Sequence, residues 1–172
     1  MSEQVAVIIV NWNGLEHLRI CVPAVLAQDY PHFQVVVVDN GSTDGSVAWL
    51  RSEFPQMRLI CNDENYGFAR ATNQGIRATT GGYAAALNND ARPEPGWLTE
   101  MVDAMEMDEK VGMVASQIRL AHRPDLMDSA GIEVDVLGIA WNRHFGRPVA
   151  QEPEEVVEVF GPCGAAALYR RE

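Results

Sequence analysis

Four short apolar runs near the start of the chain each pass directly into a loop rich in Asn and Asp, and this repeated order constrains the fold more than any other feature. The runs are Val5–Val10, Gln34–Asp39, Met57–Cys61 and Tyr83–Leu87. They lack strict alternation of polar and apolar residues, which is typical of strands covered on both faces. Ligands of a parallel α/β sheet bind outside the carboxyl ends of its strands, so we expect the four loops to form one ligand-binding edge.

Helical patterns lie between these runs and after the last one. Apolar or small residues recur at spacings of three and four, at Leu15, Leu18 and Val22, at Val47, Leu50 and Phe54, at Phe68, Ala71, Gly75 and Ile76, and at Leu98, Met101, Val102 and Met105. This alternation of strand and helix predicts an α/β fold with a mostly parallel central sheet flanked by helices. Pro23 lacks a backbone N–H group, so we expect it to kink or shorten the first helix.

Length, composition and charge narrow the class of protein. The 172 residues, 47% of them hydrophobic, fit a single domain with its own core. The net charge of −11 argues against nucleic-acid binding, which needs clustered Lys and Arg. No apolar run approaches the ~18 residues of a membrane-spanning helix, and the start Met1-Ser-Glu-Gln lacks the basic region of a signal peptide. We therefore expect a cytoplasmic protein, with peripheral contact at the inner face of the membrane left open.

The cysteines and the loop after the first apolar run exclude several kinds of site. Cys21, Cys61 and Cys163 are odd in number and widely spaced, so we expect three buried thiols and neither a disulfide framework nor a zinc site. Asn11–Gly14 lacks the G-x-G-x-x-G turn of a dinucleotide-binding fold, and the chain has no Walker-type phosphate loop. Rossmann dehydrogenases and the common nucleoside triphosphatases are therefore disfavoured.

The first two loops carry candidate contacts to a nucleotide. Trp12 lies between Asn11 and Asn13, where its ring would either stack on a nucleobase or pack in the core. Asp39 ends the second apolar run and is well placed to accept a hydrogen bond from a base imide or a ribose hydroxyl. We expect Ser42 to Asp44, which follow, to cap the next helix.

The third and fourth loops carry candidate contacts to phosphate and to a metal ion. Asn65 and Gly67 open a helix that bears Arg70 and Asn73, an arrangement that favours an approaching phosphate unless Arg70 is simply solvated. In the fourth loop, Asn88-Asn89-Asp90 follows the apolar run at once. One such carboxylate is enough for Mg²⁺ or Mn²⁺ when phosphate oxygens supply further ligands, although Asn-x-Asp is also a common turn composition.

Taken in order, these residues resemble a known family, the family-2 inverting glycosyltransferases of GT-A fold. The resemblance is closest to the bacterial rhamnosyltransferase-like branch, and it covers essentially the whole chain. The segments that carry it are Val7-Ile-Ile-Val-Asn11-Trp-Asn13, Asp39-Asn40-x-Ser42-x-Asp44-Gly45, Asn65-x-Gly67-Phe68-Ala69-x-Ala71-x-Asn73-x-Gly75, Leu87-Asn88-x-Asp90, Asp128-Ser-x-Gly131 and Gly161-x-Cys163-Gly164-Ala165-Ala166-x-Leu168-x-Arg170-Arg171.

The resemblance implies a single Rossmann-like nucleotide-sugar-binding domain whose C-terminal part is truncated. Residues 1–118 would form the donor-binding half and residues 119–172 the start of the acceptor-side half. Asp90 would bind Mg²⁺ or Mn²⁺, with Asn88 in place of the first Asp of the D-x-D motif, which should weaken metal affinity. The implied nucleotide-binding residues are Asn11, Trp12, Asn13, Asp39, Asn65, Arg70, Asn73, Asn88 and Asn89.

The implied reaction is transfer of a sugar, with inversion, from a UDP- or dTDP-sugar such as dTDP-rhamnose to the hydroxyl of a glycan or lipid-linked glycan, in cell-surface polysaccharide synthesis. Inversion needs a general base, which the resemblance places beyond Glu172, so we expect this chain to bind its donor and to transfer poorly. No motif singles out Asp128, Glu133 or Asp135 as that base.

Two alternatives come from other functional classes. A sugar nucleotidyltransferase would share the sheet, but it should show a Gly-rich loop with Arg and Lys after the first strand, which Asn11–Gly14 lacks. A non-catalytic nucleotide-sugar-binding module fits the missing base, whereas an intact Asp90 loop disfavours a decayed site. This second alternative stays open.

Overall fold

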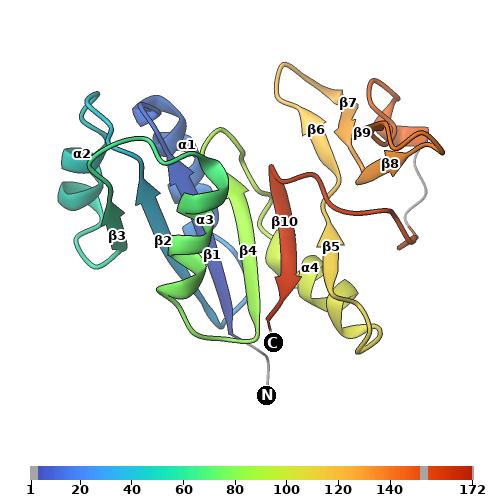
Figure 1. The fold of residues 1–172 in the computed structure, drawn as a ribbon, viewed down its shortest axis with the longest axis horizontal. Coiled ribbons are helices and arrows are strands. Elements are labelled where there is room, and N and C mark those ends of the chain that lie inside the picture. The colour runs from blue at the N-terminus through green and yellow to red at the C-terminus, as the bar shows by residue number, and fades with distance from the viewer. Residues whose placement is uncertain (1–3, 152–154, 172) are drawn as a thin grey trace.

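A six-stranded sheet organises the protein (Figure 1). The computed structural model describes residues 4–151 and 155–171, so Glu172 and most of the acidic segment 152–155 lie outside the described residues. The helices are α1 (Leu15–Leu26), α2 (Ser46–Glu53), α3 (Phe68–Arg77), α4 (Trp97–Glu106) and the short 3-10 helix η1 (Val149–Gln151). The strands are β1 (Val5–Asn11), β2 (Phe33–Asp39), β3 (Arg58–Cys61), β4 (Tyr83–Asn88), β5 (Met113–Ala115), β6 (Ile118–Leu120), β7 (Arg123–Ser129), β8 (Ile132–Val134), β9 (Ala140–Asn142) and β10 (Ala166–Arg170).

The large sheet has the strand order β3-β2-β1-β4-β10-β5, and its first four strands are parallel. β10 runs antiparallel to both β4 and β5. The predicted α/β fold with a mostly parallel sheet is therefore confirmed, and each of the four predicted strands agrees with the structure to within one residue at either end. Figure 1 shows the carboxyl ends of β1, β2 and β4 pointing to the same edge, opposite the two termini.

Helices cover both faces of the sheet, which explains why its central strands β1, β2 and β4 are mostly apolar. Val5, Val7 and Ile9 of β1 pack in one core cluster with side chains of α1, α2 and α4. Ala6 and Ile8 face the other way, into a smaller cluster with Ala71 of α3. The packing of α3 is close, because a Cβ atom on Gly75 would lie 2.6 Å from Cγ2 of Ile8.

Two expectations from the sequence need correction. Pro23 does not shorten α1, which continues to Leu26: the proline removes one intrahelical donor, but Ala27 N–H still bonds to the Pro23 carbonyl at 3.1 Å. Of the three cysteines, Cys21 is buried as expected, whereas Cys163 is half-buried and Cys61 is exposed. Cys61 is exposed because it ends β3, a four-residue strand at the outer edge of the sheet.

The remaining strands form two small antiparallel pairs, β6 with β7 and β8 with β9, before β10 returns to the large sheet. Figure 1 shows these pairs beyond the end of β5, on the side to which the parallel strands point. This part of the chain leaves many apolar side chains exposed, among them Val136, Leu137, Ile139, Phe145 and Phe160. No helix among the described residues is long and apolar enough to cross a membrane.

Candidate functional site

Strand register brings the four Asn/Asp-rich loops to one edge. Asn11 of β1 pairs with Asp39 of β2, and Asp39 in turn pairs with Cys61 of β3. On the other side of β1, Val10 pairs with Asn88 of β4. The segment before β10 joins the same edge, since Asn88 N–H donates to the Ala165 carbonyl at 2.9 Å. Four loops separated in sequence, and a fifth segment that sequence analysis missed, therefore surround one site.

Asp39 sits at the centre of this edge with its carboxylate already oriented. Oδ1 accepts a hydrogen bond from Asn11 Nδ2 at 2.8 Å, and Oδ2 accepts one from the Ser42 backbone N–H at 2.8 Å. Asp39 is 1% exposed and Asn11 is 0% exposed. Each carboxylate oxygen retains a second lone pair, so Asp39 can still accept a donor that reaches it from the loop side.

Ser42 joins the loops after β1 and β2. Its Oγ accepts hydrogen bonds from Asn13 N–H at 2.8 Å and from Asn11 Nδ2 at 3.1 Å. In return, Asn13 Oδ1 accepts from Thr43 N–H at 2.8 Å. The side chain of Asn13 therefore stabilises a loop–loop junction, a role that the sequence did not predict for it.

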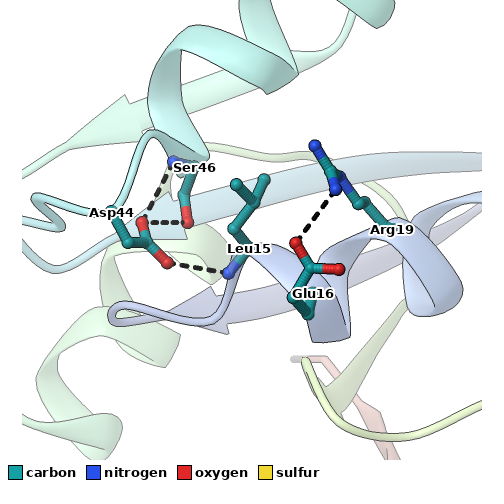
Figure 2. A network of polar contacts seen from close by, with 5 residues as sticks. All are labelled: Leu15, Glu16, Arg19, Asp44 and Ser46. Atoms are coloured by element: carbon teal, nitrogen blue, oxygen red, sulfur yellow. Dashed lines mark hydrogen bonds and ion pairs between the residues drawn. The ribbon is translucent and has the colours of Figure 1, made fainter.

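Asp44 caps two helices at once (Figure 2). Its Oδ2 accepts from Leu15 N–H at the start of α1, and its Oδ1 accepts from the backbone and hydroxyl of Ser46 at the start of α2. The expected capping by Ser42 to Asp44 thus belongs to Asp44. Partial desolvation raises the pKa of Asp44, but the hydrogen bonds from Ser46 and Leu15 outweigh it and hold that pKa below its ordinary value.

Trp12 is not a core residue, so the alternative of core packing is wrong for it. Its side chain is 57% exposed, and it lies between Asn11 and Asn13 at the end of β1. Asn13 adopts the left-handed backbone conformation with φ of 50°. An exposed indole ring at the mouth of a binding edge is free to stack on a ligand, whereas its neighbours Asn11 and Asn13 are engaged within the protein.

Amide side chains organise the third loop. Asn65 Oδ1 accepts from Gly67 N–H at 2.9 Å and from Asn40 Nδ2 at 3.2 Å, so Asn65 shapes the turn into α3. Asn62 in turn exchanges two hydrogen bonds with Gln74 of α3, both at 2.9 Å. These contacts hold the amino end of α3 against the loop after β2.

Arg70 and Asn73 both lie exposed on α3. The Arg70 guanidinium sits over the ring of Tyr66, 3.8 Å from its centroid, and the Tyr66 hydroxyl donates to Asp63 at 2.5 Å. Arg70 is therefore held by an aromatic ring at the same edge as Asp39, on the side of the third loop. Its five N–H donors form a fork that suits phosphate oxygens.

The fourth loop holds Asn89 inward and leaves Asp90 outward. Asn89 Nδ2 donates to Asn11 Oδ1 at 2.7 Å, while Asp90 is exposed and makes no hydrogen bond or ion pair with another described residue. The Asp90 carboxylate lies close enough to Cys21 to act on it: burial first, and then the charge of Asp90, raise the pKa of Cys21 to about 12. Cys21 is therefore a neutral thiol at neutral pH.

Asp90 fits a hard divalent cation that takes most of its other ligands from phosphate and water. Among residues 4–151 and 155–171, no group of three or more His, Cys, Asp and Glu side chains converges. Within these ranges no metal site built from such a cluster is found, whereas a single free carboxylate at this edge suits the way Mg²⁺ is commonly held, with phosphate and water as further ligands.

The three carboxylates considered as general bases lie in the β6–β9 region. Glu133 accepts from Trp141 Nε1 at 3.0 Å and faces Arg143 at 3.5 Å, and Asp135 Oδ1 accepts from two backbone N–H groups of its own hairpin turn. Asp128 lies half-buried on β7. Glu133 also lines an open hollow of about 490 Å³ with Trp141, Arg143 and Phe160.

Sequence reasoning missed the residues that hold the site in shape. Gly14 allows the Asn11 and Asn89 amides to meet, because a Cβ atom there would overlap Asn89 Nδ2 and lie 2.7 Å from Asn11 Oδ1. Asn40 is 2% exposed and bonds to the third loop. Both positions lie within the polar motifs, but Asn89 is 75 positions from Gly14 and Asn65 is 25 positions from Asn40, so no local pattern identifies these contacts.

Known proteins resemble the chain in sequence and in fold. A glycosyltransferase of Nostoc sp. is 30% identical over 177 residues, covering 98% of this chain and 51% of that protein. The succinoglycan biosynthesis protein ExoO of Rhizobium meliloti is 30% identical over 149 residues, covering 77% of this chain and 43% of that protein. The chain thus spans about half the length of these relatives.

A solved structure shares the fold. The mannosyltransferase PcManGT from Pyrobaculum calidifontis, in complex with GDP-Man and Mn²⁺, matches with a TM-score of 0.66 and 22% identity over 99% of this chain and 45% of that one. The family model for glycosyl transferase family 2 matches residues 6–172, the whole sheet and its ligand edge included. The chain therefore belongs to glycosyl transferase family 2, and its fold is the GT-A fold.

Proposed function

We propose that the edge formed by the four loops binds the nucleoside diphosphate of a sugar donor, and that the protein transfers this sugar to an acceptor hydroxyl with inversion. The observation that supports the proposal most is the strand register, which gathers Trp12, Asp39 and Asp90 at one edge, because they lie at or just after the carboxyl ends of three neighbouring strands. Each offers what one part of the donor needs: a stacking ring, an oriented acceptor and a free carboxylate.

In this proposal the base stacks on Trp12 and donates its imide N–H to Asp39. An exposed indole ring stacks on any base, so the selection of the base falls to the hydrogen bonds. The acceptor-only carboxylate of Asp39 favours the imide of uracil or thymine, which makes UDP- and dTDP-sugars, including dTDP-rhamnose, the proposed donors. Guanine also carries a ring N–H, and PcManGT is described with GDP-Man, so GDP belongs in the test.

Asp90 would hold Mn²⁺ or Mg²⁺ against the diphosphate, and the exposed Arg70 and Asn73 of α3 would contact the phosphates from the side of the third loop. PcManGT is described with Mn²⁺, which supports the proposal of a metal for this fold. A divalent cation there supplies electrostatic stabilisation of the leaving diphosphate. The residues of this chain bind and orient the donor: Asp90 and Asn88 hold the charged end, and Trp12 and Asp39 hold the base.

The acceptor in this proposal is a glycan or lipid-linked glycan of a cell-surface polysaccharide, as in the rhamnosyltransferase-like branch. The name of ExoO, a succinoglycan biosynthesis protein, supports a polysaccharide product. On the side of β8 and β9, the open hollow lined by Trp141, Glu133 and Arg143 offers a ring and charged hydrogen-bonding groups to a sugar. The exposed Val136 and Leu137 at the tip of the same hairpin support contact with the inner membrane face, where a lipid-linked acceptor lies.

Calorimetric titration with UDP, dTDP and GDP, each with and without Mn²⁺, tests the base contacts. Trp12→Ala should weaken UDP or dTDP binding by ~1–3 kcal/mol, the cost of losing one stacked base. Asp39→Ala should weaken the same ligands because the imide loses its acceptor. Trp141→Ala is the matched control, since Trp141 is also exposed but lies on β9. Wild-type affinity in both Trp12→Ala and Asp39→Ala would refute the proposed base site.

A second variant tests the metal contact. Asp90→Asn should abolish the enhancement of nucleotide binding by Mn²⁺ and leave the fold intact, because Asp90 lies in an exposed loop. Asp103→Asn, on the exposed face of α4, is the control. An unchanged metal enhancement in Asp90→Asn, with a normal circular dichroism spectrum, would place the metal elsewhere.

A further inference from the structure

A hydrogen-bonded series of three side chains, the buried Asp39 and Asn11 and the half-buried Asn89, crosses the candidate site from the fourth loop to the second. Asn89 Nδ2 donates to Asn11 Oδ1 at 2.7 Å, and Asn11 Nδ2 donates to Asp39 Oδ1 at 2.8 Å. We propose that Asn11 and Asn89 are positioning residues that never touch the donor, and that they fix the Asp39 carboxylate and couple it to the loop that carries Asp90. This inference rests on the proposed function, because it takes Asp39 and Asp90 as the contacts to the base and the metal.

The hydrogen bonds from Asn89 through Asn11 to Asp39 can run in only one direction. An ionised carboxylate accepts hydrogen bonds and donates none, so Asn11 must turn its NH₂ group toward Asp39. The Asn11 carbonyl oxygen then faces Asn89, so Asn89 must donate a hydrogen bond to it from its own NH₂ group. The charge on Asp39 therefore determines how both amides are oriented, and a flip of either amide would leave two acceptors facing each other.

Burial makes this chain stiff and keeps Asn11 away from ligands. Asn11 is 0% exposed, and its NH₂ group also reaches Ser42 Oγ at 3.1 Å, so Asn11 makes three hydrogen bonds inside the protein. Gly14 lies against the junction, because a Cβ atom there would overlap Asn89 Nδ2. Buried polar groups with all partners in place hold a unique arrangement, whereas the loss of one partner leaves the others unpaired.

The hydrogen bond to Asn11 gives Asn89 a role different from that of a nucleotide ligand. Asn89 precedes Asp90 directly, so the hydrogen bond to Asn11 ties the metal loop to the loops that surround the base. Without that bond, the Asp90 loop loses its side-chain tie to Asn11, and the Asn11 amide that bonds to Asp39 loses its partner on the other side. Both the affinity for the base and the effect of metal on it should fall together.

The test is a double-mutant cycle measured by calorimetry with UDP, with and without Mn²⁺. In the wild-type background, Asn89→Ala should lower UDP affinity roughly fivefold, as expected for one lost buried hydrogen bond, and should reduce the enhancement by Mn²⁺. In the Asp39→Ala background, the same change should have little further effect on metal-free binding, because Asn89 acts there through Asp39. Asn142→Ala on β9 is the control and should leave every value unchanged.

Two further variants test the direction of the chain and guard against a folding defect. Asn89→Asp keeps the size of the side chain but lacks the donor, so in metal-free buffer it should lose as much UDP affinity as Asn89→Ala. Gly14→Ala keeps both asparagines but pushes their side chains apart, so it should reproduce the loss of UDP affinity. Thermal unfolding of each variant shows whether it is folded.

Each outcome decides between the two proposals. If the wild type binds no nucleoside diphosphate, the proposed function fails and this inference fails with it. If the wild type binds UDP but the cycle is additive, or Asn89→Asp binds like the wild type in metal-free buffer, only the positioning role is refuted. A loss in Asn89→Ala that is equally large with and without Asp39 would make Asn89 a direct ligand of the donor.

Discussion

The parallel half of the molecule, β1 to β4 with α1 to α4, differs from the β6–β9 region in how it covers its apolar side chains. The strands β1, β2 and β4 of the parallel half are buried on both faces by helices, as in Val5, Val7 and Ile9 against one layer and Ala6 and Ile8 against the other. In residues 117–150 and 155–164, the buried non-glycine positions are Met127, Ser129 and Ala130. The parallel half thus carries the stability of the fold, and the β6–β9 region carries exposed apolar surface.

The same contrast holds for the polar loops. In the parallel half, Asp44 joins the starts of two helices that are far apart in sequence. In the β6–β9 region, Asp135 accepts from Leu137 N–H and Ile139 N–H, which belong to its own hairpin turn. Hydrogen bonds between distant loops thus hold the candidate site, whereas the turn of the hairpin is held by bonds within itself.

The largest effect should separate a buried leucine from an exposed one. Leu98→Ala in α4, where the side chain is 0% exposed, should lower the free energy of unfolding by about 2–5 kcal/mol through the loss of packing and the cavity left behind. Leu137→Ala in the β8–β9 hairpin, 80% exposed, should change it by less than about 0.5 kcal/mol. Urea unfolding followed by circular dichroism measures both. Equal losses of stability in the two variants would show that Leu137 is packed, and would contradict the contrast between the parallel half and the β6–β9 region.

Substitutions at two glycines should give the next largest difference in the free energy of unfolding. Gly75→Ala places a Cβ atom 2.6 Å from Ile8 Cγ2, and the overlap between α3 and β1 should cost about 1–3 kcal/mol in spite of the better helix propensity of alanine. A Cβ atom on Gly161 meets nothing within 4 Å, so Gly161→Ala should be close to neutral. Thermal unfolding of the two variants gives the comparison. A stabilised Gly75→Ala variant would mean that α3 packs less closely than described.

The cap at Asp44 should have a smaller effect that depends on pH. Asp44→Ala should lower the free energy of unfolding by about 0.5–2 kcal/mol, as for other lost caps. Because the folded pKa of Asp44 lies below its ordinary value, this contribution is fully present above the unfolded carboxyl pKa of about 3.9 and is lost as pH falls through the folded pKa.

The measurement is urea unfolding of wild type and Asp44→Ala at several pH values from neutral to acidic. The difference between the two curves should shrink toward zero at the acid end, and a difference that is independent of pH would contradict the ionised cap. Asp135→Ala is the counterpart in the hairpin. It should change the global stability less, because its hydrogen bonds hold one local turn.

The smallest effect should come from a surface ion pair. Arg19 Nη1 lies 2.9 Å from Glu16 Oε1 on α1, with side chains 49% and 78% exposed (Figure 2). Arg19→Ala should therefore lower the free energy of unfolding by less than about 0.5 kcal/mol, and by less still in high salt. Thermal unfolding at low and high salt checks this. A loss comparable to that of Leu98→Ala would contradict the view that packing stabilises the parallel half.

Much of the fold follows from local patterns. The continuous apolar runs identified β1 to β4, and the spacings of three and four identified α1 to α4, because covered strands and helices both place apolar residues at regular intervals. The polar residues directly after those runs indicated where the candidate site lies, since parallel strands end at one edge. The start of β10 was missed as part of that edge, because its pairing with β4 joins segments about 80 residues apart.

The sequence by itself determined the α/β class, the four parallel strands and the edge at which the polar loops meet, because each of these depends on short-range periodicity and on the direction of the chain. Only the tertiary structure decided that Asp44 caps two helices, that Asn89 and Asp39 both bond to Asn11, and that Cys61 is exposed. These features depend on which side chains meet across strands, and hydrogen bonds between residues 28, 29 or 78 positions apart leave no periodic signal in the sequence. The physical reason is that a motif specifies donors and acceptors, whereas packing selects their partners.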